Sequence, residues 1–392
     1  MSEHNTAYEV DANDVAFNKE YVLSLKVNKS CDDTTEAGIE NMMIDEKEET
    51  GEKLQVLWNK YLGDCASVTL ILKKKPLNLS WWGLAHFINI FLRSVGQTVF
   101  VNNPVLSFLI LVAIAFSRVE SGLGCAVGGV LATLTELCLR LHPWSLVESG
   151  VAPFNGALVG CVLPSLYPLL HGTGHAAGLW LAVCLGSVAT IFCAAGSHNI
   201  LDKFNLPFMT LPFNIISICT FLTLLPSQDD GLDSSSEALT SPSPISWAGV
   251  GEGILLSMGQ VYAVNNMLGS CLMMLAVGLY SPRLLCLAML GATIGCLVPL
   301  IFLPPTLHHQ IYQGLWGYNP LLSMAAASCV FTQWSWPSLL AGTVNTISTV
   351  FVQQALASSM VRLGLPVFTL PFVLSTLVML SSWQHRGGKR KG

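Results

Sequence analysis

The chain has 392 residues, of which 52% are hydrophobic and only 11% are charged. An ordinary soluble domain carries about a quarter charged residues, so this composition excludes a chain built only of soluble domains and indicates a membrane protein. The formal net charge of −5 comes mostly from the first 80 residues, which hold 15 of the 24 acidic residues. No basic run is interleaved with aromatic residues, so nucleic-acid binding is not expected.

Residues 1–80 are acidic and are predicted to form a mostly disordered N-terminal region. Lys73, Lys74 and Lys75 precede the apolar onset at Trp81, and a basic tail of residues 384–392 follows the last apolar segment. Because lysine and arginine favour the cytoplasmic side of a membrane, both termini are predicted to be cytoplasmic, which requires an even number of crossings.

Apolar segments alternate with short connections along the rest of the chain. Several are shorter than the roughly 20 residues that a spanning helix needs, and Gly or Pro interrupts many, which predicts some half-helices or re-entrant pieces. Between two sets of segments lies a Ser- and Pro-rich stretch, residues 226–246, without Lys or Arg, which we expect to be an extracellular loop. The segments lie near 84–101, 105–118, 122–141, 155–170, 177–196 and 208–225, then near 250–263, 268–280, 284–303, 320–332, 338–356 and 366–383.

Three motifs occur twice in the same order. The pairs are GQTVFVNN at 96–103 with GQVYAVNN at 259–266, GVAPFNG at 150–156 with GLWGYNP at 314–320, and LPFMTLPF at 206–213 with LPVFTLPF at 365–372. Their nearly constant offset predicts two membrane repeats, 81–225 and 247–383. With the N-terminus inside and the central loop outside, each repeat crosses an odd number of times. The predicted fold is therefore an all-α polytopic membrane protein with two inverted repeats, whose sites lie at the repeat interface.

The repeated motifs bring polar groups into an apolar background. Gln97 and Gln260 are uncharged amides that can both donate and accept hydrogen bonds, as a neutral polar solute would require. Thr210 and Thr369 each lie between two prolines, which we expect to interrupt the helix twice and to free backbone carbonyls that lipid cannot satisfy. A pseudo-two-fold axis would bring both threonines together near mid-depth. Helix-to-helix hydrogen bonds and kinked packing helices are the structural alternatives.

Two pairs of asparagines flank these motifs. Asn155 and Asn319 follow stretches that are too polar or too short to span, which predicts re-entrant half-helices with inward-pointing ends. Asn102–Asn103 and Asn265–Asn266 are instead expected to cap helix ends.

The doubled LPxxTLPF, the doubled GQxxxVNN and the GLWGYN segment resemble the urea transporter family of vertebrate kidney and red-cell type, over roughly Leu84 to Trp383. The resemblance implies five transmembrane helices plus one re-entrant half-helix in each repeat, a homotrimer with a pore in each protomer, and passive, channel-like passage of urea and small urea analogues across the plasma membrane. It implies no cofactor. It places Gln97 and Gln260 at the outer and inner urea sites, Thr210 and Thr369 at the constriction and Phe100 at an aromatic lining position. The expected substrate-binding residues are Gln97, Phe100, Thr210, Gln260, Thr369, Leu211, Leu370, Asn155 and Asn319.

The chain departs from the family pattern in places in both halves. Ala152-Pro153 replaces the aromatic-Gly pair that the second half keeps as Trp316-Gly317, and Ala263 stands where its repeat mate is Phe100. These departures bear on solute selectivity.

Other functional classes have weaker support. An ion- or proton-coupled transporter needs interior titratable groups, and most of the candidates lie near segment ends. An ammonia or water channel lacks support because no paired NPA box occurs. An enzyme is not expected, since HExxH, GxSxG and P-loop motifs are absent, and the 12 scattered cysteines without a CxxC pair favour neither disulfides nor a metal site. The coupling candidates are Glu120, Glu136, Glu148, Asp202 and Glu252.

Overall fold

The computed structural model describes residues 62–75, 80–167, 177–224 and 244–388, with side chains as far as Trp383. These residues belong to one compact unit, Leu57–Gly392, and the other unit, Met1–Val56, lies outside the described residues. Most of the predicted disordered region and of the predicted 226–246 loop, and the end of the basic tail, also lie outside them. Among the described residues before Trp81, Ala66–Lys73 form the helix α3.

All regular structure in the described residues is helical, which confirms the all-α class for that part of the chain. The first half contains α4 (Trp81–Gly96), η2 (Gln97–Val99), α5 (Pro104–Ser117), α6 (Val119–Leu139), α7 (Trp144–Glu148), α8 (Phe154–Leu166), α10 (Ala177–Leu201), η3 (Asp202–Phe204) and α11 (Leu211–Leu224). The second half contains α12 (Trp247–Gln260), α13 (Met267–Tyr280), α14 (Pro282–Leu297), η4 (Val298–Ile301), η5 (Pro305–Leu307), α15 (His308–Tyr312), α16 (Tyr318–Ala325), η6 (Ala326–Val330), α17 (Trp336–Met360), η7 (Val361–Leu363) and α18 (Leu370–Gly388).

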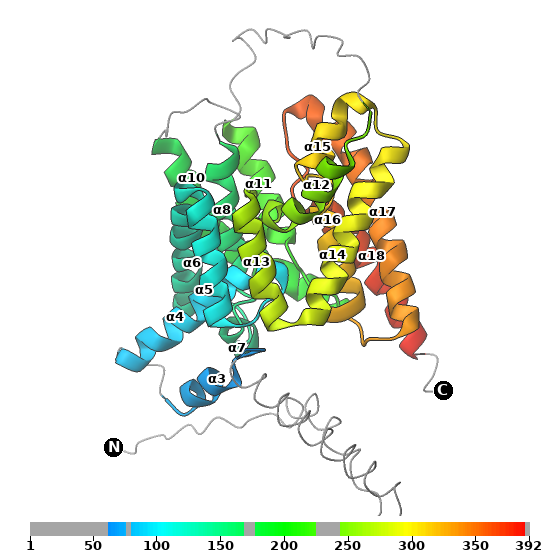
Figure 1. Cartoon of the computed structure of the whole chain (residues 1–392). Helices are drawn as coiled ribbons and strands as arrows, with labels where there is room; N and C mark the ends of the chain where they lie inside the picture. Colours follow the sequence, from blue (N-terminus) through cyan, green and yellow to red (C-terminus); the bar gives the residue numbers. More distant parts are fainter. Residues whose placement is uncertain (1–61, 76–79, 168–176, 225–243, 389–392) are drawn as a thin grey trace, which may run out of the picture. The chain divides into compact units, whose positions relative to one another are not determined.

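The two halves repeat one order of elements. The short helix α7 corresponds to α15, the 25-residue helix α10 to the 25-residue helix α17, and α11 to α18. Unusual backbone conformations recur with them, since Gly150 and Gly314 both have a φ of 76° and Met209 and Phe368 have φ values of 45° and 49°. In Figure 1, α7 lies at the lower end of the helical body and α15 at its upper end.

One asparagine of each pair that was expected to cap a helix does so, whereas Asn102 accepts a hydrogen bond from Arg93. Asn103 accepts hydrogen bonds from the backbone N–H groups of Val105 and Leu106 at the start of α5, and Asn266 accepts one from Gly269 at the start of α13. Each cap satisfies backbone donors that the first turn of a helix leaves without a partner. Both GQxxxVNN motifs therefore end one helix and begin the next.

The two prolines of each LPxxTLPF motif have different effects, which corrects the expectation that both interrupt the helix. Pro207 and Pro366 lie in non-helical backbone, whereas Pro212 and Pro371 are the second residues of α11 and α18. Proline is compatible with the first helical turn because its missing N–H would have no helical partner there. Each motif thus contains one break, directly before a threonine and a new helix.

Small residues allow the helices to pack closely. A Cβ added to Gly124 in α6 would lie 2.1 Å from the carbonyl oxygen of Gly160 in α8, a distance that no side chain tolerates. Close backbone approach of this kind is typical of helix pairs in membranes. Helices α5 and α13 contact each other across the two halves, as do α11 and α18, so the core is continuous between the repeats.

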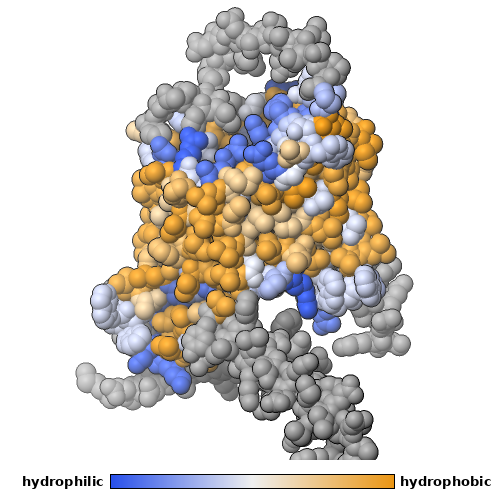
Figure 2. Space-filling view, in the orientation of Figure 1, coloured by the Kyte–Doolittle hydropathy of each residue, from blue (hydrophilic) through white to orange (hydrophobic). Residues whose placement is uncertain are grey.

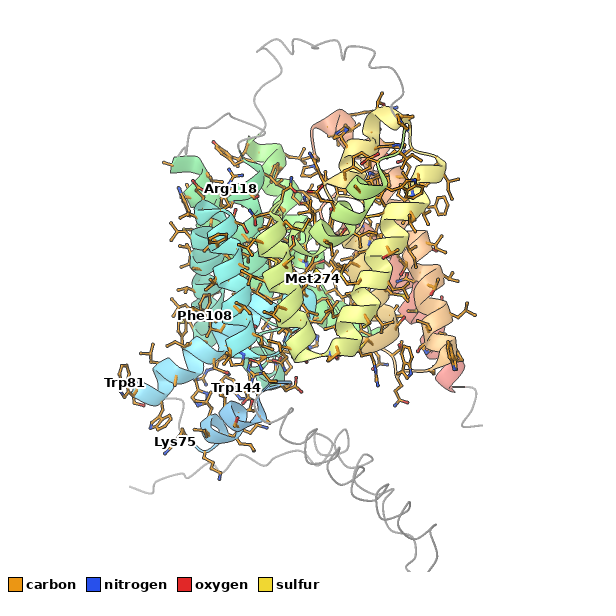
Figure 3. All side chains as sticks on the ribbon, in the orientation of Figure 1. Lys75, Trp81, Phe108, Arg118, Trp144 and Met274 are labelled. Atoms are coloured by element: carbon orange, nitrogen blue, oxygen red, sulfur yellow. The ribbon has the colours of Figure 1, made fainter. Side chains whose placement is uncertain are left out.

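The outer surface is that of a membrane protein. A broad apolar band crosses the visible face of the molecule, and more polar residues lie at the two ends (Figure 2). Phe108 and Met274 lie within the height of this band, with Lys75, Trp81 and Trp144 towards one end and Arg118 towards the other (Figure 3). Among the described helices, Val119–Leu139, Ala177–Phe204 and Pro282–Ile301 are long and apolar enough to span a membrane, and Trp81–Val99 with Pro104–Ser117 forms an apolar pair bent by 70°.

Candidate functional site

A cavity of about 600 Å³ extends from the surface beside α7 to the first LPxxTLPF motif. Both halves contribute to it, since residues of η2, α7, η3 and the first helix break line it from the first half, and residues of α13, the end of η6 and the start of α18 line it from the second. Of the described lining residues, Asp202 is the acidic one. The cavity is lined by Gln97, Thr98, Phe100, Asn102, Leu146, Ser149, Val151, Phe154, His198, Asp202, Asn205, Leu206, Pro207, Phe208, Met209, Thr210, Tyr280, Val330, Phe331 and Phe372.

The two glutamines occupy equivalent positions and make equivalent hydrogen bonds. Gln97 donates its side-chain amide to the carbonyl oxygen of Ser149 at 2.6 Å, and Gln260 donates to the carbonyl oxygen of Gln313 at 2.8 Å. Ser149 and Gln313 are the residues that follow α7 and α15, so each contact joins a longer helix to the end of a five-residue helix. Because the side-chain nitrogen of each glutamine donates to a backbone carbonyl, its side-chain oxygen points away from that carbonyl and can accept another hydrogen bond.

Thr210 and Thr369 meet at the interface between the halves. Their hydroxyl oxygens lie 2.7 Å apart, and the side chains are 2% and 3% exposed. Thr210 lines the cavity, whereas Thr369, its hydrogen-bond partner from the second half, is not among the lining residues. The repeat argument predicted that these two residues would come together, and the structure places them in direct contact.

Asn155 in α8 and Asn319 in α16 bind backbone instead of lining the cavity. Asn155 donates to the carbonyl oxygen of Met209 at 3.2 Å, and Asn319 donates to the equivalent carbonyl of Phe368 at 3.1 Å. Both carbonyls lie in the breaks between helices, where they have no helical hydrogen-bond partner. Asn155 also accepts from the N–H of Phe213. The asparagines therefore hold the broken backbone that positions the threonines, and buried polar groups require such partners.

Phe100 lies at the cavity in an aromatic group. Its ring centroid is 6.1 Å from that of Phe331 and 6.4 Å from that of Phe372, with edge-to-face geometry. Phe331 was not identified from the sequence, because it lies outside the repeated motifs. Leu211 and Leu370 begin α11 and α18 beside the threonines and are partly buried, but neither is among the residues that line the cavity.

The departures from the repeat have clear structural counterparts. Ala152 is fully buried beside Ile90 and Val147, whereas its mate Trp316 donates its indole N–H to Gln310. Ala263 has a φ of 54°, close to the 62° of Phe100, so the backbone repeats although the ring does not.

Arg93 is a buried charge that sequence reasoning missed. Its guanidinium donates to Asn89, to the carbonyl and side-chain oxygens of Asn102, to the carbonyl of Asp64 and to the hydroxyl of Thr69. These bonds connect the segment containing α3 to the corner between α4 and α5. A basic residue inside an apolar segment was the signal that could have revealed it.

Glu136 is the coupling candidate that the structure places in the interior. It is 1% exposed, and its carboxylate lies 2.7 Å from Nδ1 of His142 and accepts the backbone N–H of the same residue. The His142 ring lies 6.2 Å from the ring of His198 and 6.1 Å from that of Phe208, two residues that line the cavity. Glu136 and His142 are not among the lining residues themselves.

A metal site finds no support in the described part of the chain, where no group of three or more His, Cys, Asp and Glu side chains could hold an ion. The arrangement instead offers amide, hydroxyl and aromatic groups on a path without a fixed charge at its narrow end. These groups suit a small, neutral, polar solute.

Comparison with known proteins agrees with this chemistry. Urea transporter 1 of Capra hircus is 29% identical over 327 residues, which cover 81% of this chain and 81% of the relative. Urea transporter 1 of Ovis aries and of Mus musculus show the same identity and coverage. The profile of the family described as "Urea transporter" matches residues 88–383, three quarters of the chain. The chain belongs to the urea transporter family.

Proposed function

We propose that the chain conducts urea passively across the plasma membrane, through a pore in each protomer of a homotrimer. The observation that carries this proposal is the contact of Thr210 with Thr369 at the inner end of an uncharged part of the cavity, with equivalent glutamines on the two halves. Family membership supports urea as the solute, and the trimer follows from what the resemblance of the repeated motifs implies.

The chemistry of urea fits these groups. Urea is flat and neutral and has four N–H donors and one strong acceptor, so it must exchange its hydrogen bonds with water for others along the path. Stripping an amide-like group of its partners costs about 2–7 kcal/mol. Glutamine oxygens and threonine hydroxyls offset this cost, while Phe100 and Phe331 cover the faces of the solute. Each site binds weakly enough for release.

Passage through the narrow end requires the threonine hydroxyls to separate. Each hydroxyl then exchanges its bond to the other threonine for a bond to urea, so the number of hydrogen bonds is maintained while the solute crosses. No charge has to move, and no ion gradient is needed. The buried Glu136 does not line this path, so it gives no support to a proton-coupled mechanism.

The proposal includes two inverted repeats of five transmembrane helices, each with one re-entrant half-helix, and cytoplasmic termini. The location of α7 and α15 at opposite ends of the body supports it (Figure 1). Lys203 in η3 and Arg362 in η7 are repeat mates, and both are exposed. Cysteines at these two positions should react with a membrane-impermeant reagent from opposite sides. Labelling of both from one side would contradict the inversion, and native mass spectrometry of the complex tests the trimer.

Urea permeability tests the function. Proteoliposomes containing the purified chain should equilibrate urea much faster than protein-free liposomes, while glycerol, which is neutral but not planar, should enter both at similar rates. Equal urea rates with and without the protein would overturn the proposal. Equal acceleration of urea and glycerol would indicate an unselective pore instead.

A further inference from the structure

Asn214 breaks the symmetry of the repeats at the threonine pair. It lies one turn into α11, is fully buried, and donates from Nδ2 to the carbonyl oxygen of Thr210 at 2.7 Å and to the hydroxyl of Thr369 at 3.0 Å. Its repeat mate in α18 is Val373, which can make neither bond. One amide therefore contacts both threonines from one side.

The orientation of this amide follows from its partners. The carbonyl of Thr210 can only accept, so the group that faces it must be the amide nitrogen. The amide oxygen consequently points elsewhere, and Oδ1 of Asn214 is buried without a hydrogen-bond partner among the described residues. A buried acceptor without a partner is unfavourable, so a structural role alone does not explain it.

The contact also makes the two hydroxyls unequal. Thr369 accepts from Asn214, which occupies one of its lone pairs and leaves its own proton free to be donated to Thr210 or to a solute. Thr210 receives no such bond on its hydroxyl from Val373. The pair is thus biased, with Thr369 as the donor and Thr210 as the acceptor.

We propose that Asn214 is a specificity-determining residue of the constriction, which orients Thr369 to donate to the carbonyl of the solute and accepts one solute N–H on its own amide oxygen. This proposal rests on the proposed urea conduction and adds a third polar group to the threonine pair. Urea, with N–H groups on both sides of its carbonyl, can satisfy Thr210 and Asn214 at once. Formamide has N–H groups on one side only, so it gains less from Asn214.

Substitution of Asn214 by serine tests the proposal. A serine hydroxyl can still bond the carbonyl of Thr210, four residues earlier in the chain, but is too short to replace the contact with Thr369 or the amide oxygen. Asn214→Ser should lower urea permeability of proteoliposomes about tenfold and formamide permeability about threefold or less, so the ratio of urea to formamide falls. Asn214→Leu, nearly isosteric with asparagine, should change the ratio in the same direction.

The control is Asn345→Ser, because Asn345 is also buried but bonds Thr376 between α17 and α18. Its urea to formamide ratio should equal that of the parent, with rates normalised to the amount of protein incorporated. Equal proportional losses of both solutes in Asn214→Ser and Asn214→Leu would overturn the proposal, as would an unchanged urea rate. Absence of urea flux in the parent chain would instead overturn the proposed function.

Discussion

The hydroxyl oxygens of Thr210 and Thr369, 159 residues apart in the chain, form a hydrogen bond of 2.7 Å. Each threonine follows the break of its LPxxTLPF motif and directly precedes a helix, α11 or α18. The backbone around each break is held by an asparagine near the start of another helix, Asn155 in α8 or Asn319 in α16. Two copies of one motif therefore build a single contact at the interface between the halves.

Removal of either hydroxyl should slow urea conduction. Thr→Val keeps the shape and removes one hydrogen bond at a buried site, which raises the barrier by about 1–3 kcal/mol and lowers the flux about tenfold or more. Thr369→Val should have the larger effect, because it also removes an acceptor of Asn214. Stopped-flow urea permeability checks both variants.

Thr223→Val serves as the matched control for this pair. Thr223 is exposed on the same helix as Asn214 and bonds only the carbonyl of Cys219, in its own helix. Its flux should equal that of the parent. Parent-like flux in both Thr210→Val and Thr369→Val would show that the constriction lies elsewhere.

The glutamines should have equal effects in the two halves. Gln97 lines the cavity and Gln260 is its repeat mate, and Gln97→Leu and Gln260→Leu each remove a side-chain amide with its hydrogen bond to an equivalent carbonyl. Because both side chains are partly exposed and water can replace them in part, each loss should be about 0.5–1.5 kcal/mol, or roughly two- to tenfold in flux. A change confined to one glutamine would contradict equivalent roles.

The turn after α7 should tolerate no side chain. Gly150 has a φ of 76°, and an added Cβ would lie 2.5 Å from the backbone nitrogen of Ser94. Gly150→Ala should therefore lower the amount of folded protein sharply, measured by size-exclusion chromatography in detergent. In Gly251→Ala the added Cβ meets nothing within 4 Å, so this helical variant should behave like the parent or better. Equal yields would contradict the strain at Gly150.

The buried pair of Glu136 and His142 should stabilise the fold. Both side chains are 0% exposed, so Glu136→Leu leaves a buried imidazole without its partner and should lower the free energy of unfolding by about 3–5 kcal/mol. Glu120 is the control, because it lies 3.8 Å from Arg118 at a site where the two side chains are 38% and 36% exposed. Such surface pairs contribute about 1 kcal/mol or less. The midpoint temperature of thermal aggregation in detergent should fall clearly in Glu136→Leu and stay close to that of the parent in Glu120→Leu.

The helical class and the paired elements could be predicted because helix breaks, caps and glycines recur in local motifs. The contact between Thr210 and Thr369 followed from that repetition. Asn214 could not be found in this way, since Val373 stands at the matching position and a search for repeats passes over unmatched residues. Phe331 was missed for a similar reason, because it lies outside the repeated motifs.

The hydrogen-bond partners of Arg93 could not be predicted from the sequence for a different reason. The acceptors of Arg93 come from residues 64, 69, 89 and 102, and only folding brings them around one guanidinium. The two prolines of LPxxTLPF were assigned one effect because their sequence context is similar. Their positions relative to the helix start, which the tertiary structure sets, decide that only the first lies in a break.

Urea flux with and without an ion gradient tests the central claim most directly. Proteoliposomes containing the full chain are loaded with radiolabelled urea at equal concentrations on both sides, and a sodium or proton gradient is then imposed. Passive conduction predicts no net movement under either gradient, and a flux that follows the urea gradient alone when one is present. Accumulation of urea above its external concentration, driven by sodium or protons, would contradict passive conduction.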